Sequence, residues 1–235
     1  MFHVKHFMPL LRRKYQELYA SLLESAAELH PPYPSELTET QCESLLTYLG
    51  LLIEWTKKID LVAEADTEVL LERHLIDSLA AGILVAALVD CGPILDVGSG
   101  AGLPGVVFAL MQPDRPLYLL EPREKRSIFL AEIKRRLALP NAVVIRSRLE
   151  DLSAQLSAQK GIQPAVAATF RALVPTAELC KSAAQNLAHG GLLVYLSSPR
   201  TEPASVQGLN WQQIKYTLGL NGPARILFYS RIANS

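Results

Sequence analysis

A glycine-rich segment that directly follows a short apolar run constrains the fold of this chain more than any other feature. The run 93–98 (PILDVG) is typical of a buried strand, and glycines alternate after it at positions 98, 100 and 102. Glycine permits a sharp turn and lets the backbone approach a ligand closely beside the N-terminus of a helix. The segment therefore predicts a strand, a ligand-binding loop and a helix, which together begin a parallel α/β sheet.

Strands and helices alternate through the rest of the chain. Apolar runs predict strands at 116–121, 142–146, 165–170 and, after a turn at 190–191, at 191–196. Helices are expected at about 104–111, 123–138 and 175–188, and a helix end with a surface loop at 153–164. Two last strands, 210–218 and 224–232, form an antiparallel hairpin at one edge. The expected fold class is α/β, a Rossmann-like, mostly parallel seven-stranded sheet with helices on both faces.

The first ninety residues have a helical pattern instead. Apolar spacing predicts helices at 8–29, about 39–55 and about 67–89. Prolines 31, 32 and 34 separate the first two, and Thr38 with Gln41 has the spacing of a capping box. We therefore expect an N-terminal helical extension, 1–90, packed on a Rossmann-like domain, 91–235.

Composition limits the class of protein and its location. The 235 residues are 49% hydrophobic and 20% charged, which is ordinary globular usage. The longest near-apolar run, 80–89, is too short to span a bilayer, and the N-terminus has no apolar core of signal-peptide length. Cys42, Cys91 and Cys180 lie far apart, so neither a disulfide framework nor a metal site is predicted. We expect a cytoplasmic monomer with no membrane partner.

Charge is balanced overall, with 23 basic and 23 acidic side chains, but it is not evenly spread. The segment 122–148 holds eight basic residues and two acidic ones, and 12–14 (Arg-Arg-Lys) adds a second basic cluster. A local basic face can bind the phosphates of a nucleic acid even on a neutral protein. The alternative is a solvated helix surface on which charges pair four residues apart.

The glycine pattern indicates which cofactor the loop binds. The acidic-x-Gly-x-Gly-x-Gly pattern of Rossmann-like S-adenosylmethionine-dependent methyltransferases is present as Asp96, Gly98, Gly100 and Gly102. The dinucleotide pattern GxGxxG counted from Gly98 would need its third glycine at Leu103, and its shifted match begins two residues late. The Asp96 carboxylate suits the cationic methionine amino group, and Glu121, at the end of the second strand, can accept both ribose hydroxyls. The alternative is that both acids only cap turns.

Several motifs resemble one family specifically. They are Trp55–Val62 (WTKKIDLV), Arg73–Leu79 (RHLIDSL), Asp96–Gly105 (DVGSGAGLPG), Glu121–Leu130 (EPREKRSIFL), Arg148–Glu150 (RLE) and Phe170–Ala172 (FRA). Together they resemble the bacterial small-subunit ribosomal RNA methyltransferase G family, also called GidB, over about residues 40–197. The chain departs from the family's usual residues at Thr56, at Asp60 and at 196–198, where Leu-Ser-Ser replaces a frequent Lys-Gly.

The resemblance implies transfer of the methyl group of S-adenosylmethionine to N7 of a guanine in small-subunit (16S) ribosomal RNA, free or in the small ribosomal subunit. The implied cofactor contacts are Gly98, Leu103, Glu121, Leu149, Glu150 and Arg171. The candidate RNA contacts are Arg123, Lys125, Arg126 and Arg200, the last as a substitute for the missing lysine.

Two candidates for a catalytic role follow the fourth strand. Arg171 is expected to face the active site, and Phe170 either stacks on the target base or packs in the core. In the RHLIDSL motif, Arg73 and Asp77 lie four residues apart on a predicted helix. They either form an ion pair that orders the joint to the sheet or belong to a helix that lines the pocket.

The chemistry of N7 agrees with what is missing from the sequence. Guanine N7 carries a lone pair and no proton, so its methylation needs alignment and exclusion of water but no general base. The Asn/Asp-Pro-Pro-Tyr motif of exocyclic-amine methyltransferases is not found after the fourth strand, where 169–172 reads Thr-Phe-Arg-Ala. Two alternatives stay open: a methyltransferase acting on a small molecule, and a non-catalytic RNA-binding module on the same fold.

Overall fold

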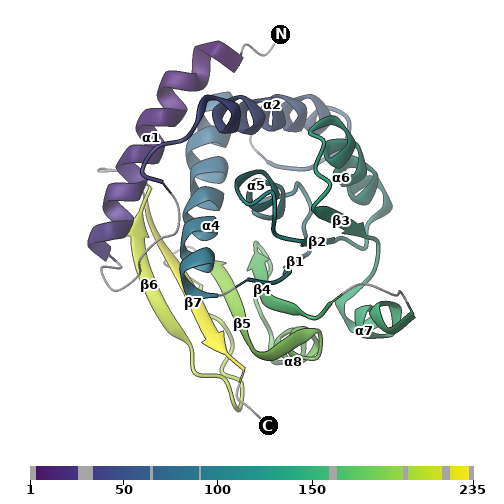
Figure 1. Cartoon of the computed structure of the whole chain (residues 1–235). Coiled ribbons are helices and arrows are strands. Elements are labelled where there is room, and N and C mark those ends of the chain that lie inside the picture. The colour runs from purple at the N-terminus through teal and green to yellow at the C-terminus, as the bar shows by residue number, and fades with distance from the viewer. Residues whose placement is uncertain are drawn as a thin grey trace.

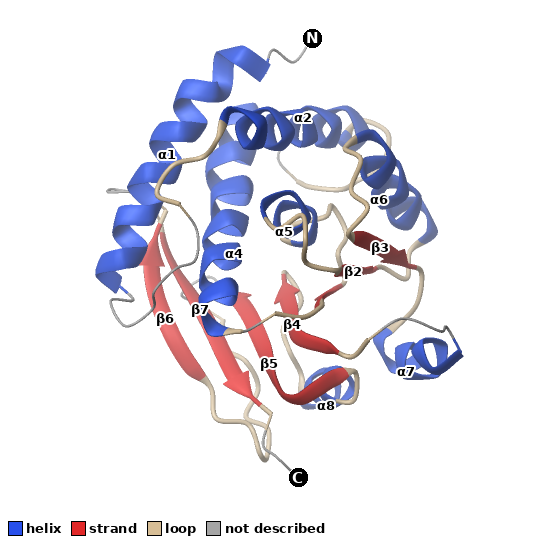
Figure 2. Cartoon of the chain, in the orientation of Figure 1, coloured by secondary structure: helices blue, strands red, loops and turns tan. Residues whose placement is uncertain are grey.

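A seven-stranded sheet with the order β3-β2-β1-β4-β5-β7-β6 forms the centre of the computed structural model (Figures 1 and 2). Its strands are β1 (Ile94–Val97), β2 (Leu117–Leu120), β3 (Ala142–Ile145), β4 (Ala165–Arg171), β5 (Leu187–Ser197), β6 (Gln212–Thr217) and β7 (Ala224–Arg231). The first five strands pair in parallel, and β7 is antiparallel to both β5 and β6. The predicted fold class and the predicted edge hairpin are confirmed.

Helices precede the sheet and cover both of its faces. They are α1 (Val4–Ser25), α2 (Glu39–Thr56), α3 (Thr67–Leu70), the π-helical turn η1 (Leu71–Leu75), α4 (Ile76–Leu88), α5 (Gly105–Met111), α6 (Glu124–Arg136), α7 (Leu149–Ala158) and α8 (Ala177–Ala184). The structure describes residues 4–25, 34–63, 66–89, 91–158, 163–197, 201–218 and 223–232. None of the helices in these ranges is both long enough and apolar enough to cross a membrane.

The structure corrects two boundaries expected from the sequence and locates a third. The helix expected at 67–89 contains the π-helical turn η1, and the helix end expected within 153–164 is the end of α7 at Ala158. The predicted turn at 190–191 lies inside β5, which begins at Leu187. The reason is a bulge: Ala165 of β4 pairs with Leu187 and Ala167 pairs with Leu192, so β5 accommodates extra residues between these two pairs.

Side chains of the central strands alternate between two hydrophobic clusters. Ile94, Leu117 and Ala167 belong to the cluster that also contains residues of α1, α2, α4, α5 and α6. Leu95 and Phe170 belong to the second cluster, with residues of α7 and α8. Because successive strand residues point to opposite faces, both faces of the sheet are buried, as a parallel sheet covered by helices requires.

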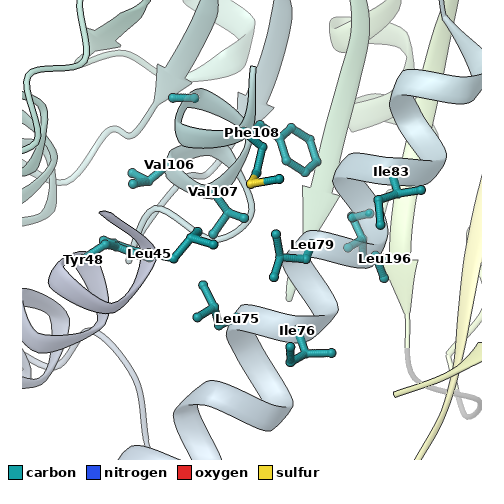
Figure 3. Close-up of a cluster of buried hydrophobic side chains, with 14 of the residues drawn as sticks. Leu45, Tyr48, Leu75, Ile76, Leu79, Ile83, Val106, Val107, Phe108 and Leu196 are labelled. Carbon is teal, nitrogen blue, oxygen red and sulfur yellow. The ribbon is translucent and has the colours of Figure 1, made fainter. Parts of the chain in front are cut away.

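The N-terminal helices form one continuous core with the sheet. Figure 3 shows Leu75, Ile76 and Leu79 of the η1–α4 segment near Leu45 of α2, Val107 of α5 and Leu196 of β5. Helix α1 lies along β6, where the Ser21 and Thr217 hydroxyls are 2.9 Å apart (Figure 1). Thr38 caps α2 with the predicted capping box.

Candidate functional site

A cleft with two adjoining chambers lies at the carboxyl ends of the parallel strands. The first chamber, of about 710 Å³, extends past Glu121 and Leu149, which follow β2 and β3. The second, of about 640 Å³, is bordered by Leu196 and Ser197 of β5 and by the start of α4. Gly98, Arg126, Arg171 and Ala172 line both chambers. In open parallel sheets, ligands bind at this edge where the strand order reverses, here between β1 and β4.

The Asp96 carboxylate lies beneath the glycine loop and does not line either chamber. One of its oxygens accepts from the Gly105 N–H at 3.2 Å, and the other accepts from the Thr169 hydroxyl at 3.0 Å. Asp96 is almost fully buried, and this burial raises its pKa from 3.8 to about 6 against the opposing effect of its hydrogen bonds. Asp96 therefore fastens the loop to the start of α5 and to β4, and its contact with the cofactor's ammonium group, direct or through water, stays a prediction.

Asp96→Asn should remove a pH dependence of stability between about pH 4 and pH 6. The native state holds its proton on Asp96 up to a higher pH than the unfolded state does, so protonation favours the native state. This contribution of Asp96 to the free energy of unfolding is fully present below pH 3.8, the pKa of the unfolded state. It is lost as the pH rises through about 6, the pKa of the native state. It amounts to no more than about 3 kcal/mol at 1.36 kcal/mol per pKa unit.

Asparagine can accept from Gly105 with its oxygen and donate to the Thr169 hydroxyl, so the variant should keep the loop in place. Urea unfolding of both proteins at pH 4, 5, 6 and 7 gives the test. The difference in unfolding free energy between Asp96→Asn and the wild type should increase with pH in favour of the variant. A difference that stays constant across this range would contradict the assignment.

The glycine loop itself is held on two further sides. The Glu121 carboxylate accepts from the Gly100 N–H and from the Arg123 N–H, both at 2.9 Å. The buried Tyr48 hydroxyl of α2 donates to the Ala101 carbonyl at 2.6 Å. Gly100 has a left-handed φ of 52°, which glycine adopts without steric cost. The loop is thus fixed by the sheet below it and by the N-terminal helices beside it.

Arg171 is held by one turn of helix at the junction of the chambers. Its guanidinium donates to the carbonyls of Arg73 and His74 and to the Ser78 hydroxyl, at 3.2, 3.4 and 3.0 Å. It also lies 3.0 Å from His74 Nδ1, which must accept because a guanidinium has only donors. The two carbonyls belong to the π-helical turn η1, a type of turn that often occurs at functional sites.

Asp77 connects Arg171 to the C-terminal hairpin. Its side chain is 7% exposed and forms ion pairs with Arg171 at 3.2 Å and with Arg225 of β7 at 3.6 Å. It also accepts from the Tyr216 hydroxyl of β6 at 2.9 Å. His74 and Asp77 both line the second chamber. The reading that the RHLIDSL helix lines the cleft is therefore confirmed. Among the described residues, the ion pairs of Asp77 that join this helix to the sheet are with Arg171 and Arg225 and not with the expected Arg73.

Phe170 has the environment of a core residue. It is fully buried in the cluster beneath α8, because strand alternation directs it to the face opposite Arg171. A target base could not stack on it in this arrangement, so the packing alternative describes it. The neighbouring residues Thr169 and Arg171 point to the other face of β4, where the Thr169 hydroxyl donates to Asp96.

The other predicted site residues are divided between the chambers. Leu149 and Glu150 line the first chamber, and the exposed Glu150 lies 3.6 Å from Arg148. Leu103 lines the second. Arg123 and Lys125 are exposed at the start of α6, whereas Arg126 donates to the Asp60 carbonyl at 3.0 Å. Arg200 lies outside the described residues.

Sequence reasoning missed several residues of the cleft. Arg225 lines the second chamber and belongs to the terminal hairpin, whose sequence carries no motif. Tyr216 of the same hairpin contacts Asp77 without lining either chamber. Leu173 and Val174 follow Ala172, which has a left-handed φ of 56°, and are 39% and 47% exposed. Each of the two lines one chamber, so the cleft has an apolar rim between its halves. Exposure of large apolar side chains beside a cleft is a signal that only the structure gives.

Comparisons with solved structures agree on the fold. The structure of MtNAS in complex with MTA and tNA aligns with a TM-score of 0.52 and 12% identity, covering 98% of this chain and 90% of that one. The fibrillarin/Nop5p complex aligns with a TM-score of 0.50 and 13% identity, covering 69% of this chain and 82% of that one. At these identities the likeness concerns the fold alone.

Sequence comparisons identify the family. Ribosomal RNA small subunit methyltransferase G of Ectopseudomonas mendocina is 45% identical over 129 residues, which is 55% of this chain and 58% of the relative. The chain thus matches little more than half the length of that relative. The protein of the same name from a Psychrobacter species is 32% identical over 201 residues, which is 85% of this chain and 84% of the relative. Residues 41–209 match the family GidB, rRNA small subunit methyltransferase G. The chain therefore belongs to the rRNA small subunit methyltransferase G family.

Proposed function

We propose that this protein transfers a methyl group from S-adenosylmethionine to N7 of a guanine in small-subunit ribosomal RNA. The observation that carries the proposal is the two-chambered cleft at the carboxyl edge of the sheet, in a chain of this family. The chambers meet at Gly98 and Arg171, so two ligands bound side by side would share this junction. Residues of one chain line both chambers.

The residues of the cleft fit the chemical groups of S-adenosylmethionine. The first chamber combines a carboxylate, Glu121, with the apolar side chains of Leu149 and Leu173. A carboxylate accepts from ribose hydroxyls, and apolar walls suit a flat purine. The second chamber contains arginines that suit a carboxylate or a phosphate, namely Arg126, Arg171 and Arg225. Glu121, Leu149 and Glu150 would hold the adenosine part, and Gly98 and Leu103 would border the methionine part.

When bound, S-adenosylmethionine supplies an electrophilic methyl group on its sulfonium sulfur. The lone pair of guanine N7 would accept this methyl group, the electrons of the broken sulfur–methyl bond would stay on the departing S-adenosylhomocysteine, and no proton would be released. The protein's task would then be to align the two ligands and exclude water. Asp77 is the one carboxylate among the described residues that line the second chamber, and it is paired with Arg171 and Arg225. A site whose carboxylate is occupied in this way suits a reaction that needs no general base.

The surface beside the first chamber suits RNA. Several cations of the basic segment are paired within the protein: Arg146 with Glu124, Arg148 with Glu150, and Arg135 and Arg136 with Glu132. Within the described part of the chain, no ion pair engages Arg123 or Lys125 at the start of α6. These two exposed cations are therefore available to phosphates at the mouth of the cleft, where single-stranded RNA would enter.

The test is methyl transfer from labelled S-adenosylmethionine to small-subunit ribosomal RNA and, separately, to assembled small subunits, followed by nucleoside analysis. Label in N7-methylguanosine is the expected result. The double variant Arg123→Ala/Lys125→Ala should raise the KM for RNA and reduce its salt dependence, because about two phosphate contacts are lost. The matched control is Lys181→Ala, which removes an exposed cation of α8 outside the basic segment.

Different results would lead to different conclusions. Label in another nucleoside would reject N7 as the acceptor but keep RNA as the substrate. Cofactor binding by calorimetry without label in either RNA substrate would reject RNA methylation and favour a small-molecule acceptor or a binding role. A KM that is equally insensitive to salt in the wild type and the double variant would reject the basic surface as the RNA contact.

A further inference from the structure

A buried tyrosine of the C-terminal hairpin contacts Asp77, a residue that lines the second chamber. Tyr216 of β6 is 2% exposed, and its hydroxyl lies 2.9 Å from Asp77 Oδ1. The other oxygen, Asp77 Oδ2, is 3.2 Å from the Arg171 guanidinium. A chain of three side chains therefore connects the edge of the sheet to the junction of the two chambers.

The carboxylate of Asp77 faces two cations, and the hydroxyl distinguishes its two oxygens. Arg225, which pairs with Tyr216 across the hairpin, lies 3.6 Å from Oδ1, too far for a good hydrogen bond. The hydroxyl donates to that same oxygen, so Oδ2 is left directed at Arg171. Rotation of an aspartate carboxylate about its last torsion is otherwise only weakly restricted.

Tyr216 itself is well fixed. Its neighbour Thr217 is hydrogen-bonded to Ser21 of α1, and its ring belongs to the core cluster shared with the N-terminal helices. Burial and the adjacent Asp77 raise the pKa of Tyr216 well above 10, so the hydroxyl keeps the proton that it donates. The tyrosine thus has a rigid support, a defined donor and an acceptor that contacts the cleft arginine.

We propose that Tyr216 is a positioning residue, whose hydroxyl orients Asp77 so that Asp77 holds Arg171 at the junction of the chambers. The activity test of this proposal rests on the proposed function, and a spectroscopic test does not. The hairpin β6–β7 would then contribute to the site without contacting either ligand through Tyr216.

The activity test compares Tyr216→Phe with the wild type. We expect kcat/KM for methyl transfer to fall about tenfold, the effect of one hydrogen bond to a charged group. In an Arg171→Lys background the same substitution should change kcat/KM by less than about twofold, because residues acting through one another are not additive. An equal loss in both backgrounds would mean that Tyr216 does not act through Arg171.

The matched control is Tyr15→Phe. Tyr15 of α1 is also fully buried and donates through its hydroxyl at 2.9 Å, but its acceptor is the Pro34 carbonyl, far from the cleft. Both variants should lose similar thermal stability, and only Tyr216→Phe should lose activity. If Tyr15→Phe reduces kcat/KM as much, the effect of Tyr216 is general destabilisation and the proposal is wrong.

A second measurement is independent of activity. In ¹⁵N spectra, the Nη resonances of Arg171, assigned by their loss in Arg171→Lys, report how freely the guanidinium rotates. Hindered rotation in the wild type and in Tyr15→Phe, with faster rotation in Tyr216→Phe, is the expected result. Unchanged rotation in Tyr216→Phe would overturn the proposal even if RNA methylation is confirmed. The expected change would support it even if the wild type methylates no RNA.

Discussion

Asp77→Ala is expected to lower the free energy of unfolding by about 3–5 kcal/mol, the usual cost of removing one partner from a buried ion pair. The substitution leaves the Arg171 and Arg225 side chains, 13% and 19% exposed, without their shared carboxylate. It also leaves the buried Tyr216 hydroxyl without its acceptor. Urea unfolding at pH 7 measures the loss.

Asp66→Ala is the matched control for this prediction. Asp66 caps α3 by accepting from the Val69 N–H at 3.0 Å, but it is exposed and carries no ion pair in the described part of the chain. Its removal should cost about 1 kcal/mol, as for other helix caps. If Asp77→Ala lowers the free energy of unfolding by no more than Asp66→Ala does, the buried contacts of Asp77 with Arg171, Arg225 and Tyr216 do not stabilise the fold as argued. Adding Arg171→Met to Asp77→Ala should recover part of the loss, because an uncompensated charge is removed.

Glu121→Gln is expected to weaken binding of S-adenosylhomocysteine about a hundredfold, since hydrogen bonds to a charged group contribute about 1.5–3 kcal/mol each. Both Glu121 oxygens already accept from backbone N–H groups, one of them on the glycine loop. An amide can accept with only one oxygen, and its NH₂ group would face an N–H donor at 2.9 Å. The loop would shift and the carboxylate for the ribose would be lost together. Calorimetry measures the affinity.

Asp151→Asn is the control beside the same chamber. Asp151 is exposed at the start of α7 and lines neither chamber, so we expect less than about a threefold change in affinity. Equal losses at Glu121 and Asp151 would indicate a general electrostatic attraction in place of the specific arrangement around Gly100. No loss at Glu121 would remove the first chamber as the cofactor site.

The sequence was sufficient for the sheet and for the edge that carries the site. Each strand predicted from an apolar run is present, because strands buried on both faces need continuous apolar residues. Gly98, Glu121 and Leu149 follow three different strands and Arg171 ends a fourth, and the structure brings all four residues to one cleft. Their convergence could be expected because the carboxyl ends of parallel strands lie along the same edge.

A local sequence pattern could not predict the structure where two different structures share the same pattern. Residues 67–89 have helical apolar spacing whether or not a π-helical turn interrupts them, so η1 was not predicted. Phe170 at a strand end suited either stacking or packing until the register of β4 placed it beneath α8. Asp96 suited either a ligand site or a turn cap in the sequence, and its contacts with Gly105 and Thr169 follow only from the packing of the loop on β4.

Periodicity and turn residues act between near neighbours, so they were sufficient to predict the strands, most of the helices and the strand ends that carry chemical groups. The partners of Asp77, in contrast, come from elements that lie far from it along the chain. Arg171, Arg225 and Tyr216 reach it from β4 and from the hairpin, with Tyr216 separated from Asp77 by 139 positions. Such contacts depend on how the strands pair and on how α4 packs on the sheet, and no local sequence pattern encodes that packing.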